Sequence, residues 1–417
     1  MPVLQFREKE TLPEASPAPL VLDRIVHPQQ QAGEPRGWLI QGDNLAVMRA
    51  LAERFPQGVP LIYTDPPFFT NKRYAVRVGR GEDSRRPETW QLAEGYADRW
   101  PDLDAYLAFL WPRLQAMYRL LAPNGTLYVH LDWHAAPYVR VLLDELFGPR
   151  RLLNEIVWVY HGPSPIRRAF NRKHDTILAY TKGDDYFFNA DAVRVPYHPN
   201  TVETFKASSK AGFGKVPDLK RGKVPEDWWY FPVVARLHKE RTGYPTQKPE
   251  ALVERVLRAS SHEGDWIGDV FLGSGTTAVV AARLGRRFVG VDASWRAIHI
   301  AAQRLVLAGA PPFVVWRVGQ VPVPTPEPPQ GWGVQRTAQG LALRSPNWAA
   351  VETWEVDPDY DGQVFRSQIQ GVRPFRGVEP LPRILPFPEG ETKTRTVAVR
   401  VVLRDGQELR WLQSMSN

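Results

Sequence analysis

The sequence contains no cysteine and only four methionines among its 417 residues. The lack of cysteine excludes disulfide bonds and thiolate metal sites, and it fits a reducing cytoplasm, where we expect the protein to be located. No apolar run approaches the roughly 20 residues that a bilayer span requires. Residues 1–14 carry charges of both signs and no apolar core, so we expect neither a signal peptide nor contact with a membrane.

Hydrophobic residues and positive charge are both abundant. Hydrophobic residues make up 43% of the chain, which is enough for a packed core, and the length predicts two or three domains. The formal net charge is +8, and residues 160–245 hold 15 Lys and Arg against nine Asp and Glu. Such a basic stretch permits a polyanionic partner, although a charge run taken alone is more simply a solvated face.

Apolar runs and amphipathic segments alternate over residues 37–160 and 246–310. This alternation predicts an α/β domain with a doubly wound, Rossmann-like sheet, in which helices separate parallel strands. Strands are expected at 37–41, 59–63, 126–131, 154–160, 175–180, 265–271 and 287–291, and helices at 45–51, 102–121, 135–147, 249–261, 278–284 and 294–307.

The remaining segments lack this alternation. We expect residues 1–36 to form an N-terminal arm, and 69–101 to form a loop long enough to act as a lid or binding element. Residues 161–245 mix basic and aromatic side chains, a combination suited to phosphate contacts and base stacking. Residues 311–330 form a proline-rich linker, and residues 331–417 hold short alternating pieces that predict a small β domain of the sandwich type.

The stretch Asp65-Pro66-Pro67-Phe68 follows a predicted buried strand and therefore lies at the edge where open α/β sheets bind ligands. Proline has no backbone N–H, so the carbonyls of this stretch stay free to accept hydrogen bonds. An acid, rigid carbonyls and a flat ring together suit a planar group that bears an NH2. Taken alone, however, the motif favours an ordinary turn.

A second motif follows the predicted strand at 265–271. Residues 272–277 form a glycine turn that opens a helix, and Asp292 ends the next strand. This is the plan of a Rossmann-type nucleotide site, in which an acid at the second strand meets ribose hydroxyls. Ala278 stands where a dinucleotide site would have its third glycine, and the turn has no basic residue for a pyrophosphate.

Together these residues resemble a known family. Asp65-Pro66-Pro67-Phe68 is similar to the catalytic motif of amino-methylating DNA methyltransferases, and residues 246–249 and 269–277 are similar to two of their cofactor motifs. The catalytic motif precedes the glycine motif, with a basic region between them. This is the permuted order of the β class, which includes adenine-N6 enzymes and modification subunits of type III restriction systems. The match covers roughly residues 37–307.

The resemblance implies S-adenosylmethionine as the cofactor. The residues that it implies for the cofactor site are Asp43 at the adenine ring, Gln247 and Lys248 near the methionine moiety, Asp269, Phe271, Gly273, Ser274, Gly275, Thr276 and Thr277 along the glycine motif, and Asp292 at the ribose. Three positions depart from the family pattern: Val270 replaces a proline, Leu272 replaces a smaller residue, and Phe68 replaces a tyrosine. None of these changes removes a cofactor-contacting group, although Phe68 loses a hydroxyl.

The resemblance also implies a reaction, namely site-specific transfer of a methyl group to N6 of adenine in double-stranded DNA. We hypothesise that the target base is flipped out of the duplex and stacks on Phe68, while Asp65 and the Pro66 carbonyl accept its two N–H bonds and Pro67 stiffens the loop. Cytosine-N4 methylation is the alternative within enzymes; because those enzymes more often carry serine at the position of Asp65, the acid favours adenine. A degenerate, non-catalytic DNA-binding module is the alternative of another class.

Residues 161–245 are the expected target-recognition region. The basic residues expected to contact DNA are Arg167, Arg168, Arg172, Lys173, Lys220 and Arg221. Further candidate partners are a restriction or helicase subunit and a second protomer. His130, His134, His161 and His174 lack metal-ligand spacing, so we expect no metal site.

Overall fold

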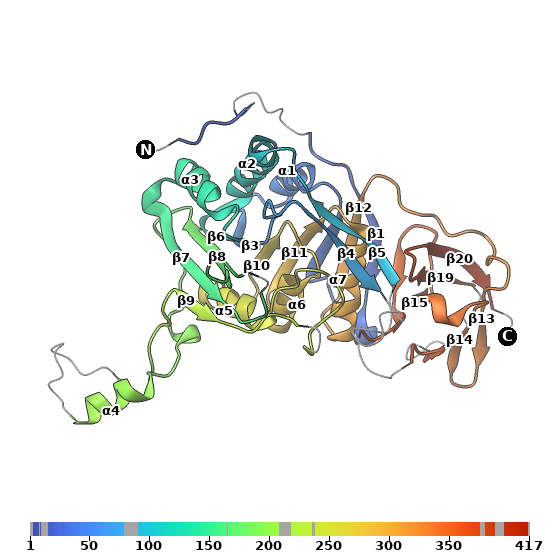
Figure 1. Ribbon diagram of the computed structural model, residues 1–417. Helices are drawn as coiled ribbons and strands as arrows, with labels where there is room; N and C mark the ends of the chain where they lie inside the picture. Colours follow the sequence, from blue (N-terminus) through green and yellow to red (C-terminus); the bar gives the residue numbers. More distant parts are fainter. Residues whose placement is uncertain are drawn as a thin grey trace.

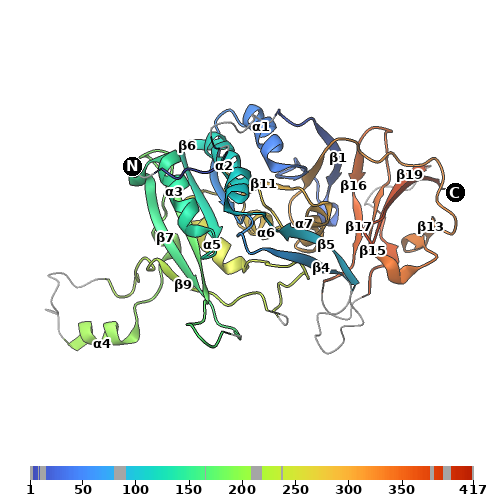
Figure 2. The same cartoon turned by 45° about the horizontal axis from the view of Figure 1, so that its top comes forward.

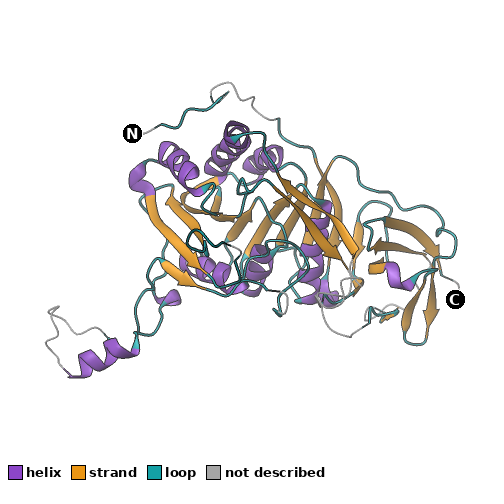
Figure 3. Ribbon diagram, in the orientation of Figure 1, coloured by secondary structure: helices purple, strands orange, loops and turns teal. Residues whose placement is uncertain are grey.

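The computed structural model describes residues 3–7, 9, 16–78, 91–164, 166–207, 218–235, 238–375, 380–387 and 396–415. Within them, the chain forms one large mixed sheet with helices on both faces, and a smaller all-β region lies beside it (Figure 1, Figure 3). No helix in these residues combines the length and hydropathy needed to cross a bilayer.

The large sheet has eleven described strands. Their order is β16 (Phe365–Ser367), β1 (Leu20–Val26), β12 (Phe313–Val318), β2 (Gly37–Gln41), β11 (Arg287–Asp292), β10 (Trp266–Asp269), β3 (Val59–Thr64), β6 (Leu121–Leu131), β8 (His174–Thr181), β7 (Leu152–Val159) and β9 (Trp228–Tyr230). The strands from β12 to β6 are parallel, whereas β8 is antiparallel to both β6 and β7. The predicted doubly wound α/β fold is therefore confirmed, with antiparallel additions at both ends.

Two hydrophobic cores cover the two faces of this sheet. Successive strand residues point to opposite faces, so Ile40 and Ile62 lie in one core while Leu39 and Leu61 lie in the other. Helices α1 (Asn44–Arg54), α2 (Leu103–Leu120) and α3 (Ala136–Phe147) cover the first face, and α5 (Glu250–Ser260), α6 (Thr276–Arg283) and α7 (Trp295–Leu307) cover the second (Figure 1). Helix α4 (Pro199–Ala207) projects away from the body (Figure 2).

Two segments expected outside the sheet lie within it. Residues 20–26, expected in an arm, form β1, and residues 313–318, expected in a linker, form β12, to which β1 pairs antiparallel. The prediction failed at β1 because Asp23 and Arg24 make this strand look polar in sequence. Both side chains are buried in the structure.

The expected loop at 69–101 is also wrong. It contains a hairpin of β4 (Lys72–Val78) and β5 (Gln91–Asp98), and residues 79–90 between them lie outside the described part of the chain. The predicted strand at 175–180 is confirmed as β8, which lies in the central sheet between β6 and β7 although it falls within the bounds of the expected target-recognition region. The aromatic run at 228–231 begins with β9, in which Trp229 is buried and its neighbours Trp228 and Tyr230 are exposed.

The C-terminal residues form two small sheets. One contains β13 (Gly333–Thr337), β14 (Gly340–Arg344) and β18 (Ile384–Leu385), and the other β17 (Ile369–Val372), β15 (Val351–Asp357), β19 (Thr396–Leu403) and β20 (Glu408–Ser414). Both contribute to one core around Trp354 and Trp411. This region is joined to the large sheet, because β16 pairs with β1.

A buried ion cluster fastens the C-terminal region to the large sheet. It consists of Asp23, Arg24, Arg317, Glu355, Arg400, Glu408 and Arg410. Asp23 accepts hydrogen bonds from Arg24 at 2.7 Å and from Arg410 at 2.5 Å, and its side chain is fully buried. Burial alone would raise the pKa of Asp23, but the guanidinium groups of Arg410, Arg24 and Arg317 lower it to about 2.

We predict that Asp23→Asn lowers the free energy of unfolding by about 3–5 kcal/mol, since it removes one of the three carboxylates that offset the four arginines of this buried cluster. Urea unfolding followed by tryptophan fluorescence measures this loss. The matched control is Asp361→Asn, which breaks an exposed pair with Arg366 and should change stability little. Equal losses in the two variants would show that the cluster does not hold the regions together.

Candidate functional site

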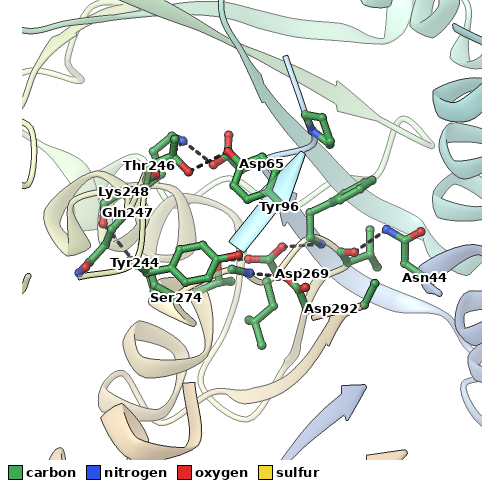
Figure 4. A pocket seen from close by; sticks show the side chains of 18 of the residues that line it. Asn44, Asp65, Tyr96, Tyr244, Thr246, Gln247, Lys248, Asp269, Ser274 and Asp292 are labelled. Atoms are coloured by element: carbon green, nitrogen blue, oxygen red, sulfur yellow. Dashed lines mark hydrogen bonds and ion pairs between the residues drawn. The ribbon is translucent and has the colours of Figure 1, made fainter. Parts of the chain in front are cut away.

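Four acids lie near the carboxyl ends of four neighbouring parallel strands. Asp43 follows β2, Asp65 follows β3, Asp269 ends β10 and Asp292 ends β11. Because these strands are parallel and adjacent, all four acids reach the same edge of the sheet. They line a cavity of about 290 Å³ there (Figure 4).

Most of the predicted site residues line this cavity. They are Asp43, Asp65, Pro67, Gln247, Lys248, Asp269, Phe271, Gly273, Ser274, Thr276, Thr277 and Asp292. Gly275 is not among the lining residues. Its φ is +78°, and a Cβ there would lie 2.6 Å from the Cβ of Ala301, so this glycine lets helix α7 pack closely against the turn.

The glycine turn is held by the two acids at the ends of β10 and β11. Gly273, with a left-handed φ of +52°, donates its N–H to Asp292 Oδ2 at 2.8 Å, and Asp292 Oδ1 accepts the N–H of Ser294 at 2.8 Å. Thr277 donates its hydroxyl to Asp269 Oδ2 at 2.6 Å. Burial raises the pKa of Asp269 to about 7 and that of Asp292 to about 6.

Asp43 performs two structural tasks. Its Oδ1 caps helix α1 by accepting the N–H groups of Leu45 and Ala46, as expected for a residue at this position. Its Oδ2 accepts a 2.6 Å hydrogen bond from Arg113, which also donates to the side chain of Asn44 at 2.7 Å. Arg113 and Asn44 were not predicted as site residues. The arginine among the apolar residues of the predicted helix at 102–121 was a signal that could have identified Arg113.

Lys248 is directed at Asp65 rather than at the glycine turn. Its ammonium donates to Asp65 Oδ2 (Figure 4), and it lies 5.1 Å from the centroid of the Phe68 ring. Asp65 Oδ1 is buried and has no hydrogen-bond partner. One oxygen of this acid is therefore fixed by a cation, and the other is an unused acceptor.

Gln247 lines the cavity, but its amide is already engaged. The side-chain carbonyl accepts two hydrogen bonds from Thr242, at 3.0 and 2.9 Å, and the amide nitrogen donates to the Glu240 carbonyl at 2.7 Å. We infer that Gln247 shapes the segment that precedes helix α5.

The Asp65-Pro66-Pro67-Phe68 loop is held from several sides. Tyr106 donates its hydroxyl to the Pro67 carbonyl at 2.8 Å, so this carbonyl is not free, contrary to expectation. The Phe68 ring lies nearly parallel to that of His130, with centroids 6.1 Å apart. His130 is buried and is hydrogen-bonded to Tyr63 and Asp175. No group of three or more acidic or histidine side chains in the described residues is arranged to hold a metal ion.

Part of the segment expected to be a loop lines the cavity or holds the catalytic loop. Tyr96, Ala97 and Trp100 line the cavity, and Asp98 hydrogen-bonds to the backbone of residues 68–70. Their sequence context showed no clear period, because β5 pairs only with β4 in a two-stranded ribbon and has no second neighbour to impose a pattern. The only sequence signal for these residues was the tripeptide Tyr96-Ala97-Asp98 at the end of a polar stretch.

The predicted DNA-contacting residues fall into two groups. Arg167, Arg168, Arg172 and Lys173 lie between β7 and β8, at the carboxyl end of a strand that runs in the direction of β3, and hence at the edge that holds Asp65. The guanidinium carbon of Arg172 lies over the Trp133 ring, 4.1 Å from its centroid. Lys220 and Arg221 precede β9, which begins at the opposite edge. Arg221 is paired with Asp191, so its charge is already offset.

Comparison with known proteins agrees with this geometry. The family described as DNA methylase, of the N6 and N4 type, matches residues 59–303. The chain is 32% identical over 259 residues to the type II methyltransferase M.HpaI of Haemophilus parainfluenzae, covering 62% of this chain and 71% of that one. It is 31% identical over 260 residues to the type II methyltransferase M2.DpnII of Streptococcus pneumoniae, covering 61% and 85%.

Solved structures are more distant. The crystal structure of the M1.HpyAVI–SAM complex superposes with a TM-score of 0.42 at 19% identity, covering 64% of this chain and 98% of that one. A likeness at this level adds nothing to the sequence relationship. The family match spans more than half of the chain, and the protein therefore belongs to the N6 and N4 DNA methylases, whose methyl donor is S-adenosylmethionine.

Proposed function

We propose that this protein methylates the exocyclic N6 of adenine at a specific site in double-stranded DNA. The observation that carries the proposal is the state of Asp65. Lys248, whose ammonium lies 5.1 Å from the centroid of the Phe68 ring, fixes one of its oxygens, and the other oxygen is buried without a partner. An unpaired buried carboxylate oxygen is costly unless a ligand completes it, and an amine N–H is a donor that would do so.

The cavity fits S-adenosylmethionine by the chemistry of its lining. Asp292 would bind the ribose hydroxyls, since each of its oxygens accepts only one backbone N–H and keeps a lone pair. Phe271, Phe109 and Trp100 offer apolar surface for the adenine ring, and the left-handed Gly273 lets a ligand approach the backbone closely. Because Gln247 is engaged elsewhere, we assign the methionine end to the neighbourhood of Asp269 and Ser274.

The protein groups around Asp65 meet the needs of a weak nucleophile. The lone pair of an exocyclic amine is delocalised into the base, so the nitrogen must be drawn towards a tetrahedral geometry before it reacts. Asp65 Oδ1 and the Pro66 carbonyl would accept the two N–H bonds of the amine and favour that geometry. Phe68 would hold the flipped base by stacking. The bound cofactor supplies a methyl group on a sulfonium, and alignment by the protein supplies much of the rate.

Adenine is favoured over cytosine because the motif begins with an acid, whereas the family resemblance implies that cytosine-N4 enzymes more often carry serine there. The two products differ chemically, as 6-methyladenine and 4-methylcytosine. Mass spectrometry of nucleosides from DNA methylated in vitro separates them. We expect 6-methyladenine, and 4-methylcytosine would assign the alternative substrate.

DNA would approach the edge that carries Asp65. Arg167, Arg168, Arg172 and Lys173 lie at that edge and would contact phosphates, whereas Lys220 and Arg221 would meet only DNA that extends around the molecule. The recognised sequence would be selected by residues of the region 161–245. A restriction or helicase subunit and a second protomer remain proposed partners.

We predict that Asp65→Ala abolishes methyl transfer, by at least about 1000-fold, while it leaves cofactor binding within about threefold of wild type. The reason is that the variant removes the acceptor for the amine but leaves the walls formed by the glycine turn and Asp292. Transfer is measured with radiolabelled cofactor and binding by calorimetry. A catalytically inert binding module would show no transfer even in the wild type, and wild-type rates in Asp65→Ala would refute the proposed role.

We predict that cofactor affinity falls as the pH drops through about 6, the raised pKa of Asp292. The ionised carboxylate is the better hydroxyl acceptor, so the affinity that it provides is present above this pKa and is lost below it, by up to about tenfold per pH unit. Asp292→Asn should weaken binding about 10- to 100-fold at pH 8 and reduce the pH dependence. Calorimetric titrations with the cofactor at pH 5 to 8 measure both effects. The assignment would be contradicted if the wild type and Asp292→Asn showed the same dependence of affinity on pH.

A further inference from the structure

Asp98 accepts five hydrogen bonds, four of them from residues 68–70 of the catalytic loop. Its carboxylate accepts the backbone N–H groups of Phe68, Phe69 and Thr70 at 3.2, 3.0 and 2.8 Å. It also accepts the Thr70 hydroxyl at 2.7 Å and the Trp100 indole N–H at 2.8 Å. Asp98 is only 1% exposed, so these bonds form away from bulk water.

The loop needs such an acceptor for reasons that begin in its sequence. Pro66 and Pro67 have no N–H, so Phe68, Phe69 and Thr70 provide the first backbone donors after Asp65. Phe69 has a φ of +66°, a left-handed conformation that is uncommon and costly for an aromatic residue. Consecutive N–H groups that converge in this way form a concave site for an anion, and Asp98 is the anion that fills it.

Asp98 also joins this loop to the cofactor cavity. It ends strand β5, two residues after Tyr96, whose hydroxyl lies 3.1 Å from that of Thr246. The paired strand β4 is tied to the same segment, because Arg77 donates its N–H to the Gly243 carbonyl at 3.0 Å. The hairpin therefore contacts both the segment that carries Lys248 and the loop that carries Asp65.

We propose that Asp98 is the positioning residue that sets the geometry of Asp65 and Phe68 for methyl transfer, an inference that rests on the proposed function. Its carboxylate is buried and engaged with the loop, so it acts through the loop and not on the substrate. Without it, three backbone donors lose their charged acceptor, and the left-handed turn at Phe69 loses the contacts that hold it.

The test compares Asp98→Asn with a matched control, Asp102→Asn. The amide keeps the shape of Asp98 but directs an NH2 group at donors, whereas Asp102 is the more exposed cap of helix α2 and accepts only the Ala105 N–H from the backbone. Single-turnover methylation with saturating cofactor and DNA gives a rate constant that does not depend on the fraction of folded enzyme. We expect a loss of about 100-fold for Asp98→Asn, as for a misplacement of about 1 Å, and less than threefold for the control.

Amide hydrogen exchange at Phe68, Phe69 and Thr70 measures directly whether their N–H groups stay hydrogen-bonded, and it does not depend on activity. We expect at least a tenfold loss of protection there in Asp98→Asn, while the calorimetric dissociation constant for the cofactor stays within threefold of wild type. A milder variant, Thr70→Val, removes one bond to Asp98. It should slow transfer about fivefold in the wild-type background and have no further effect in the Asp98→Asn background.

The outcomes separate the two proposals. If the wild type methylates DNA and Asp98→Asn does so at an unchanged rate, or with unchanged exchange at residues 68–70, the inference about Asp98 is overturned and the proposed function stands. A parallel loss of cofactor binding would also overturn it, because the residue would then serve the cavity as a whole. A wild type that methylates no DNA refutes the proposed function and with it the positioning role of Asp98. If Asp98→Asn does not fold, two milder variants replace it, namely Thr70→Val and Tyr106→Phe, which removes the hydrogen bond to the Pro67 carbonyl. The inference predicts that their losses in transfer rate are coupled in the double variant. Losses that simply add would overturn it.

Discussion

The site depends on the direction of four strands. Strands β2, β11, β10 and β3 are adjacent and parallel, so the acids at or just beyond their carboxyl ends must meet at one edge. This arrangement brings Asp65 and the glycine turn into the lining of one cavity, although the two lie about two hundred positions apart in the sequence. The antiparallel strands at either end widen the sheet without disturbing this edge. They also bring the loop with Arg167 to Arg172 to the side from which DNA would approach.

Concentrating acids in one cavity has an electrostatic cost. Burial raises the pKa of Asp269 to about 7 and that of Asp292 to about 6, so ionising both carboxyl groups within this cavity is unfavourable. Two devices offset this cost. Backbone N–H groups donate to both of these acids, the Thr277 hydroxyl also donates to Asp269, and the ammonium of Lys248 pairs with Asp65. A cationic cofactor would extend the same compensation, which relates the chemistry of the cavity to its ligand.

The sequence allowed the fold and the family to be predicted, but not the way in which the loop is held. Strand β3 and the glycine turn were recognisable because apolar period and glycine spacing are local signals. Strand β1 was missed because Asp23 and Arg24, which pair with each other, have their other partners hundreds of positions away, at Arg317, Glu355 and Arg410. Asp98 and Arg113 were missed because their partners lie tens of positions away in the sequence and on other parts of the fold. Gln247 was predicted to bind the cofactor, and in the structure it lines the cavity while its side-chain amide is hydrogen-bonded to Thr242 and Glu240.

The central claim is that this edge of the sheet methylates adenine within a defined DNA sequence. Single-molecule sequencing of DNA from a host without methyltransferases of its own, expressing this chain, tests it most directly, because base and sequence context are read together. The account predicts N6-methyladenine at nearly every copy of one short sequence and at no other position. Unmodified DNA, or a modified base other than adenine, would contradict it.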